Sequence, residues 1–277
     1  MRNLCRATAH LFWQHPILWL PVALADAIAV SLTYLQRLLQ KHAADGLTQT
    51  HSVLGGRPEI SASQTSILPV YLITVCLVAI TSLLVSFLFA NALLTIAAML
   101  RNLAHAGRPN LEAAVGSIKP DLGRALFFAL RLFTVSLVIG ILASAIIMLP
   151  TLLLSARHSV ANPLYALAES LVSAAVIAYL IAPHALHLLR PVGSAPAAGQ
   201  EALFARSTAI ATVILSTALS YLFNKAALPA SPHAAQVTVH AIASEIAALP
   251  YAALFIALAL IAMPDSPLAA RQPDTRV

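Results

Sequence analysis

The sequence predicts an all-α fold: a polytopic membrane protein built as a bundle of six transmembrane helices, joined by short amphipathic cytoplasmic segments. The first observation is composition. Of the 277 residues, 60% are hydrophobic and only 9% are charged, whereas a soluble domain carries about 25% charged residues. The second is the stretch from Ile60 to Leu100, which contains no Asp, Glu, Lys or Arg. A helix rises about 1.5 Å per residue, so roughly 20 apolar residues cross a bilayer core, and this stretch is longer.

The N-terminal segment, residues 1–15, is expected to be a short interfacial helix on the cytoplasmic side. Trp13 and Trp19 would lie at the level of the lipid headgroups. Two arginines ahead of an apolar run also resemble a signal peptide, and residues 23–25 resemble a cleavage site. The apolar pattern continues to Leu39, however, which is too long for the apolar region of a signal peptide. We therefore favour an uncleaved first span.

Polar or proline-containing segments divide the rest of the chain. The transmembrane domain is predicted over residues 16–263, followed by a polar cytoplasmic tail over residues 264–277. The longest connection, from Lys41 to Ser66, contains glycines and several Ser and Thr residues and is predicted to be a loop. In the crossing over residues 101–124, Asn110 can cap a short helix. The six spans are expected at about 16–39, 67–100, 125–149, 164–189, 202–223 and 237–263.

The distribution of basic residues predicts the orientation. Of the 16 Lys and Arg residues, eleven fall on the side of the two termini and five on the opposite side. The positive-inside rule then predicts that both termini lie in the cytoplasm. The expected location is a bacterial inner membrane. This topology accounts for the formal net charge of +6, and no motif for binding nucleic acid is visible.

Small residues recur at four-residue spacing in spans three to six, a pattern typical of closely packed membrane helices. In the fourth span the row consists of Ser170, Ala174, Ala178 and Ala182. We predict that these spans form a compact group. The alternative is that an alanine-rich chain produces such rows by chance.

Polar groups inside a bilayer are costly, so they are the best indicators of function. The candidates for an intramembrane polar site are Asp26, Asn91, Glu169 and Glu245. The two glutamates are expected near the outer side, with Asp26 deeper, and the group could line a polar cavity or a proton relay. The alternative is that each acid is protonated or pairs locally as a packing group.

Basic residues of the cytoplasmic segments are candidates for contacts with anionic headgroups. They are Arg108, Lys119, Arg124 and Arg131. Arg131 lies two turns inside the third span, where it can snorkel to the interface or hold a lipid phosphate. His184 and His187 share a helix face, but a metal site needs further ligands. We expect no metal and no cofactor.

Two cytoplasmic crossings carry a resemblance to a known family. The first comprises residues 106–114 and leads through Arg124 into the third span, and the second runs from His184 to Arg206. Both are similar to the membrane domain ahead of some glycerophosphoryl diester phosphodiesterases, and to related uncharacterised six-helix proteins. The resemblance covers roughly residues 10–263 and implies architecture alone, because the chemistry of those enzymes belongs to an attached barrel domain. The tryptophan expected after Ser207 is replaced by Thr208.

The sequence contains no motif of a serine hydrolase, zinc protease, P-loop or dinucleotide-binding protein, so we expect no enzyme. The leading hypothesis is a non-catalytic membrane module that binds lipid, anionic lipid in particular, or a partner membrane protein. The alternative is a secondary transporter that uses Asp26, Glu169 and Glu245, with the proline-interrupted spans four and six as moving parts. An intramembrane enzyme comes third.

Overall fold

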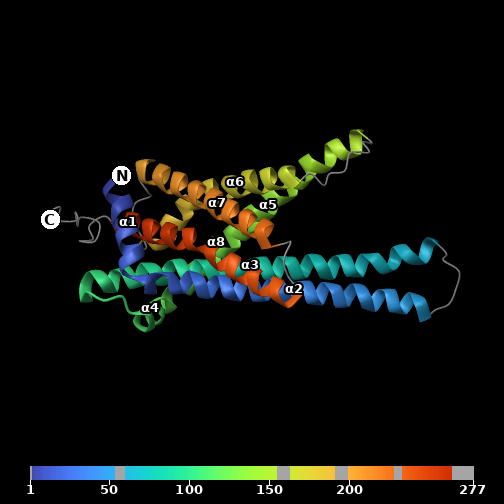
Figure 1. Cartoon of the computed structure of the whole chain (residues 1–277), viewed down its shortest axis with the longest axis horizontal. Helices are drawn as coiled ribbons and strands as arrows, with labels where there is room; N and C mark the ends of the chain where they lie inside the picture. Colours follow the sequence, from blue (N-terminus) through green and yellow to red (C-terminus); the bar gives the residue numbers. More distant parts are fainter. Residues whose placement is uncertain (1, 54–59, 155–162, 191–198, 228–232, 264–277) are drawn as a thin grey trace.

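The computed structural model describes residues 2–53, 60–154, 163–190, 199–227 and 233–263. Side chains are described for residues 4–42, 72–143, 170–190, 199–222, 242 and 244–263. Within these ranges the chain is almost entirely helical and has no strand, and six helices are long and apolar enough to cross a membrane (Figure 1). The predicted all-α fold with six apolar helices is therefore confirmed. The predicted tail over residues 264–277 lies outside the described residues.

Ten helical elements follow one another along the described parts of the chain. They are α1 (Arg2–Gln14), η1 (Pro16–Trp19), α2 (Leu20–Val53), α3 (Ile60–Ala106), α4 (Leu111–Ser117), η2 (Lys119–Asp121), α5 (Leu122–Leu154), α6 (Pro163–Leu189), α7 (Gly199–Ala227) and α8 (His233–Ala262). Each predicted span falls within a helix, except that the first residues of span one form η1 and Met263 follows α8. Prolines 183 and 250 lie inside α6 and α8 without ending them.

The N-terminal segment folds as a separate short helix that lies across the axis of α2 (Figure 1). His15 and the turn of η1 redirect the chain into α2. The indole Nε1 of Trp19 donates a hydrogen bond to the carbonyl oxygen of Phe12 at 2.8 Å, and the two rings lie 4.7 Å apart. The Trp13 side chain is 73% exposed. This exposure is what an aromatic residue at a membrane interface requires.

The α2–α3 connection differs from its prediction. The loop expected from Lys41 to Ser66 is wrong for most of its length, because α2 continues to Val53 and α3 begins at Ile60. A single glycine such as Gly46 costs a helix only about 1 kcal/mol, and the other residues here tolerate helical geometry. The apolar part of α2 therefore ends before the helix itself ends.

The connection between α3 and α5 agrees with its prediction. Gly107 follows α3 with a φ of +69°, a left-handed conformation that glycine adopts without strain. The Asn110 side chain accepts a hydrogen bond from the backbone N–H of Ala113 at 3.1 Å and so caps α4. The predicted helix cap is confirmed.

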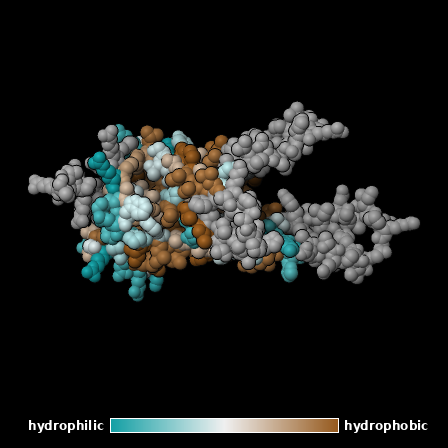
Figure 2. Space-filling model, in the orientation of Figure 1, coloured by the Kyte–Doolittle hydropathy of each residue, from teal (hydrophilic) through white to brown (hydrophobic). Residues whose placement is uncertain are grey.

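Helix α8 is the centre of the bundle. It packs against α1, α2, α3, α6 and α7, and its residues from Leu254 to Ile261 are buried. Among the residues whose side chains are described, the large apolar side chains of α2 and α5 are mostly exposed instead, as expected for helices that face lipid. Figure 2 shows a hydrophobic band across the described part of the chain, with hydrophilic residues gathered where α1 and α4 lie. We call the end of the bundle where these hydrophilic residues gather the basic end. Helices α3, α6 and α8 end there, and helices α5 and α7 begin there.

Candidate functional site

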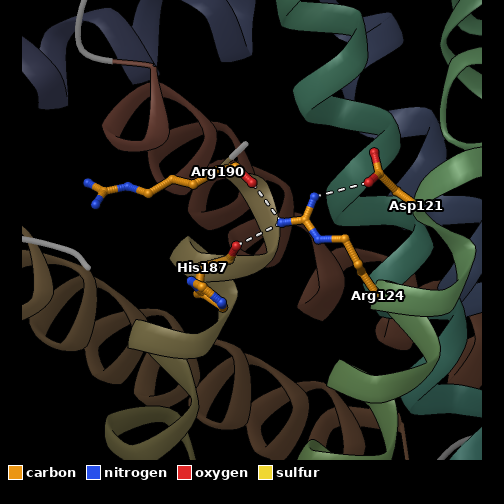
Figure 3. Close-up of polar contacts among 4 residues, drawn as sticks. All are labelled: Asp121, Arg124, His187 and Arg190. Carbon is orange, nitrogen blue, oxygen red and sulfur yellow. Dashed lines mark hydrogen bonds and ion pairs between the residues drawn. The ribbon is translucent and has the colours of Figure 1, made fainter. Parts of the chain in front are cut away.

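Arg124, in the first turn of α5, organises the basic end. Its Nη1 donates to Asp121 Oδ1 at 3.0 Å, and its Nη2 donates to the carbonyl oxygens of His187 at 3.0 Å and Arg190 at 2.6 Å (Figure 3). The His187 carbonyl belongs to the last turn of α6 and that of Arg190 follows the helix directly, where a helix leaves acceptors without partners. A cation is also favoured at a helix C-terminus. The guanidinium group therefore caps α6 from the side of α5.

Arg190 extends this arrangement to a third helix. Its Nη2 lies 2.6 Å from Glu201 Oε2 in the first turn of α7, and its side chain is only 12% exposed. A carboxylate in the first turn of a helix is favoured by the helix dipole. We call Asp121, Arg124, Arg190 and Glu201 the arginine clamp. It joins the two crossings that carry the family resemblance.

A basic pocket of 260 Å³ lies between α5 and α6 beside the clamp. Its polar lining consists of Arg124, Arg131, His184 and His187, and its apolar lining includes Phe127, Phe128 and Leu188. His184 lies within electrostatic reach of Arg131, His187 and Arg206. Among the described residues, no acidic side chain lines this pocket.

Arg131 differs from Arg124 in how its charge is satisfied. The Arg131 side chain is exposed, and in the described part of the chain it takes part in no ion pair or side-chain hydrogen bond. Helical side chains lean toward the N-terminus of their helix, which for α5 is the basic end. The Arg131 guanidinium is therefore directed from the apolar part of the bundle toward its polar boundary.

An apolar cavity of 360 Å³, partly open to the surroundings, is lined by α3, α5, α6, α7 and α8. Apart from Ser86, Ser136 and Tyr251, its lining is aliphatic or phenylalanine. The predicted small-residue row of α6 contributes Ala174, Ala178 and Ala182 to this lining. On this face the small residues border a cavity, so the row does not act simply as a closely packed helix contact.

A polar cluster joins α2, α7 and α8. The Ser244 hydroxyl donates to Asp26 Oδ2 at 2.7 Å. Glu245 and Tyr251 lie within electrostatic reach of Asp26. The Ser216 hydroxyl of α7 donates a hydrogen bond to the carbonyl oxygen of Ala247 in α8 at 2.6 Å. Two of the four predicted intramembrane residues, Asp26 and Glu245, are thus brought together.

The other two intramembrane candidates are placed differently. Asn91 Nδ2 donates to the Phe87 carbonyl of its own helix at 2.8 Å, and its Oδ1 is buried without a partner among the described residues. The side chain of Glu169 lies outside the described residues. A site that contains all four residues therefore stays a prediction.

The four basic candidates also separate. Arg108 and Lys119 are exposed on the crossing between α3 and α5, Arg124 belongs to the clamp, and Arg131 lines the basic pocket. Sequence reasoning did not place His184 and His187 in a pocket beside Arg131. Their signal was the three-residue spacing on one face of α6, opposite the basic face of α5.

Sequence reasoning also missed a partner of Arg206. This guanidinium group lies 4.4 Å from the centroid of the Tyr179 ring, and its Nη1 lies 3.4 Å from the Tyr179 hydroxyl. A cation over an aromatic ring is stabilised electrostatically. The contact ties α7 to α6 near the basic pocket.

Comparison of the chain with protein-family models, with curated proteins and with solved structures finds no match. The resemblance to the phosphodiesterase membrane domain therefore stays a prediction. A function for the chain has to be inferred from its own geometry.

Proposed function

We propose that this protein is a non-catalytic, multi-pass module of the bacterial inner membrane that binds the headgroup of an anionic lipid in the basic pocket. Both termini would lie in the cytoplasm, and the basic end of the bundle would meet the cytoplasmic leaflet. The observation that carries the proposal is the pocket between α5 and α6, where Arg131, His184 and His187 converge.

The composition of the pocket suits a phosphate group at a membrane boundary. An arginine can donate two parallel hydrogen bonds to phosphate oxygens, and imidazole N–H groups supply further donors. Phe127, Phe128 and Leu188 provide apolar surface for the glycerol region beside them. Anionic lipids of the cytoplasmic leaflet are attracted to basic residues by about 1 kcal/mol per residue.

Binding fits the lining of the pocket better than chemistry does. The described side chains that line it are basic or apolar, and they include no serine, threonine, cysteine or carboxylate. A covalent mechanism would need a nucleophile beside a base. The donors of the pocket are arranged to hold an anion.

The test is the lipid preference of the purified protein. Native mass spectrometry of the delipidated protein with equal amounts of phosphatidylglycerol and phosphatidylcholine should show preferential retention of phosphatidylglycerol. Arg131→Gln should reduce that retention. Arg37→Gln, which removes an exposed arginine of α2 that does not line the pocket, is the matched control and should leave it unchanged. Equal retention of the two lipids by the wild-type protein would refute the proposal.

One observation favours the transporter alternative. Asp26 and Ser244 form a polar contact between α2 and α8, with Glu245 in electrostatic reach, and proton-coupled transporters use such intramembrane acids. The three cavities described for the chain are not lined by Asp26 or Glu245. Local pairing of Asp26 with Ser244 therefore explains the contact more simply than a transport pathway.

A further inference from the structure

The basic pocket and the apolar cavity follow one another along the same two helices. Phe128 of α5 lines both of them. Beyond it, Leu132 and Ser136 continue the apolar lining at one-turn intervals. On α6, His184, His187 and Leu188 line the pocket, whereas the cavity lining runs from Ala185 back to Ala174. The two spaces therefore succeed each other from the basic end into the bundle.

The apolar cavity has the size and chemistry of a ligand site. Its volume of 360 Å³ falls within the range of roughly 300–1,000 Å³ typical of ligand pockets. Protein interiors are otherwise close-packed, so a partly open apolar hollow of this size between helices offers room for an apolar ligand. The width comes from α6, whose Ala174, Ala178 and Ala182 stand where larger side chains would fill the space.

We propose that this cavity holds one acyl chain of the same anionic lipid whose headgroup occupies the basic pocket. The inference rests on the proposed function and extends it from headgroup contact to the whole lipid. The ligand class is a phospholipid, with the phosphate at Arg131, the glycerol region near Phe128 and one chain directed toward Tyr251. The second chain lies along the exposed apolar surface of α5, which includes Phe127 and Leu130.

The lining of the cavity argues for a hydrocarbon chain over a polar solute. Moving a chain from bilayer to protein yields no hydrophobic gain, because both surroundings are apolar. Occupancy must therefore come from packing in the cavity together with the charge of the pocket. Phe128, only 8% exposed, lies at the junction, where it would contact both parts of one bound lipid.

The test fills the cavity without touching the pocket. Ala182 is 3% exposed and lines the cavity, so Ala182→Leu should exclude the chain. Ala211, exposed on α7, supplies the matched control Ala211→Leu. The probes are long-chain phosphatidylglycerol and its dihexanoyl analogue, measured by native mass spectrometry. Each affinity is compared with that of the wild-type protein for the same lipid, so that partitioning into detergent cancels.

We expect Ala182→Leu to weaken the binding of long-chain phosphatidylglycerol about tenfold and to leave the binding of the dihexanoyl analogue unchanged. Arg131→Gln should weaken the binding of both lipids, and Ala211→Leu should change the binding of neither. If Ala182→Leu leaves long-chain binding intact while Arg131→Gln still reduces it, the chain lies outside the bundle and only the headgroup proposal survives. If the wild-type protein shows no preference for the anionic lipid, the proposed function itself fails.

A second measurement covers the case in which Ala182→Leu does not fold. Wild-type protein is incubated with phosphatidylglycerol carrying a diazirine at the end of each acyl chain and is irradiated. Cross-links should map to peptides of α7 and α8 that border the cavity, around Val213 and Leu254. Cross-links confined to the exposed face of α5 would overturn the inference.

Discussion

The arginine clamp and the basic pocket share Arg124 and lie side by side, yet they satisfy their charges differently. In the clamp, the guanidinium groups of Arg124 and Arg190 contact carboxylates and the carbonyls of α6. In the pocket, Arg131 has no such partner in the described part of the chain. The difference separates basic residues that hold the helices together from one that is available to a ligand. It predicts opposite outcomes for substitutions only two turns apart on α5.

The largest expected effect is on stability and concerns Arg124. Arg124→Gln removes the charge that caps α6 and leaves Asp121 without its ion pair, and hydrogen bonds to charged groups are worth about 1.5–3 kcal/mol. We expect a loss of about 2 kcal/mol in the free energy of unfolding, measured by denaturant titration in detergent. Arg108→Gln, on the exposed crossing, is the control and should change it by less than about 0.5 kcal/mol. Equal effects of the two substitutions would remove the distinction between clamp and surface.

Arg131→Gln should change lipid binding and leave stability nearly unchanged. Because Arg131 has no partner to lose within the described residues, the free energy of unfolding should change by less than about 0.5 kcal/mol. Affinity for phosphatidylglycerol should fall about tenfold, which corresponds to about 1.4 kcal/mol. Thermal unfolding and native mass spectrometry on the same preparation give both values. A stability loss as large as that of Arg124→Gln would place Arg131 with the structural residues.

A smaller effect on stability is expected from the ion pair between Arg190 and Glu201 in the clamp. Arg190 and Glu201 form a half-buried ion pair, so a double-mutant cycle of Arg190→Gln and Glu201→Gln should yield a coupling energy of about 1 kcal/mol. Unfolding of the four proteins provides the cycle. A coupling near zero would mean that the pair does not join α6 to α7, and the clamp would then consist of Arg124 and its partners alone.

The smallest effect concerns the polar cluster. Ser244→Ala removes one hydrogen bond to Asp26 and should destabilise the protein by about 1 kcal/mol or less. Asp26→Asn keeps an acceptor for Ser244 and should have less effect still. If Asp26→Asn instead abolishes proton-coupled uptake by the protein in liposomes while Ser244→Ala does not, the cluster belongs to a transport pathway and is a third class of polar site beside the clamp and the pocket.

The parts of the fold that depend on local chemistry were predictable from the sequence. The length of the apolar runs indicated six helices, and Gly107 with Asn110 indicated where one helix ends and the next is capped. The extension of α2 to Val53 was missed because helix formation does not require apolar residues. Contacts between distant residues were also missed. Arg124 and Arg190 lie 66 positions apart, and Asp26 and Ser244 lie 218 apart.

The sequence indicated Arg131 as a residue of the candidate site, but it did not indicate how the residues of the basic pocket are arranged. Arg131 stood out as an arginine inside an apolar span, but its proximity to His184 depends on how α5 and α6 pack. The alanine row of α6 was interpreted as a close helix contact, because small residues favour such contacts. The same residues line a cavity, and the sequence pattern does not distinguish the two outcomes.

The most direct test of the headgroup site is a cryo-electron microscopy structure of the protein in nanodiscs that contain phosphatidylglycerol. We expect an ordered lipid phosphate within hydrogen-bonding distance of the Arg131 guanidinium, between α5 and α6, and its loss in Arg131→Gln. An empty basic pocket, with ordered phosphates only at other surfaces of the bundle, would contradict the proposed headgroup site.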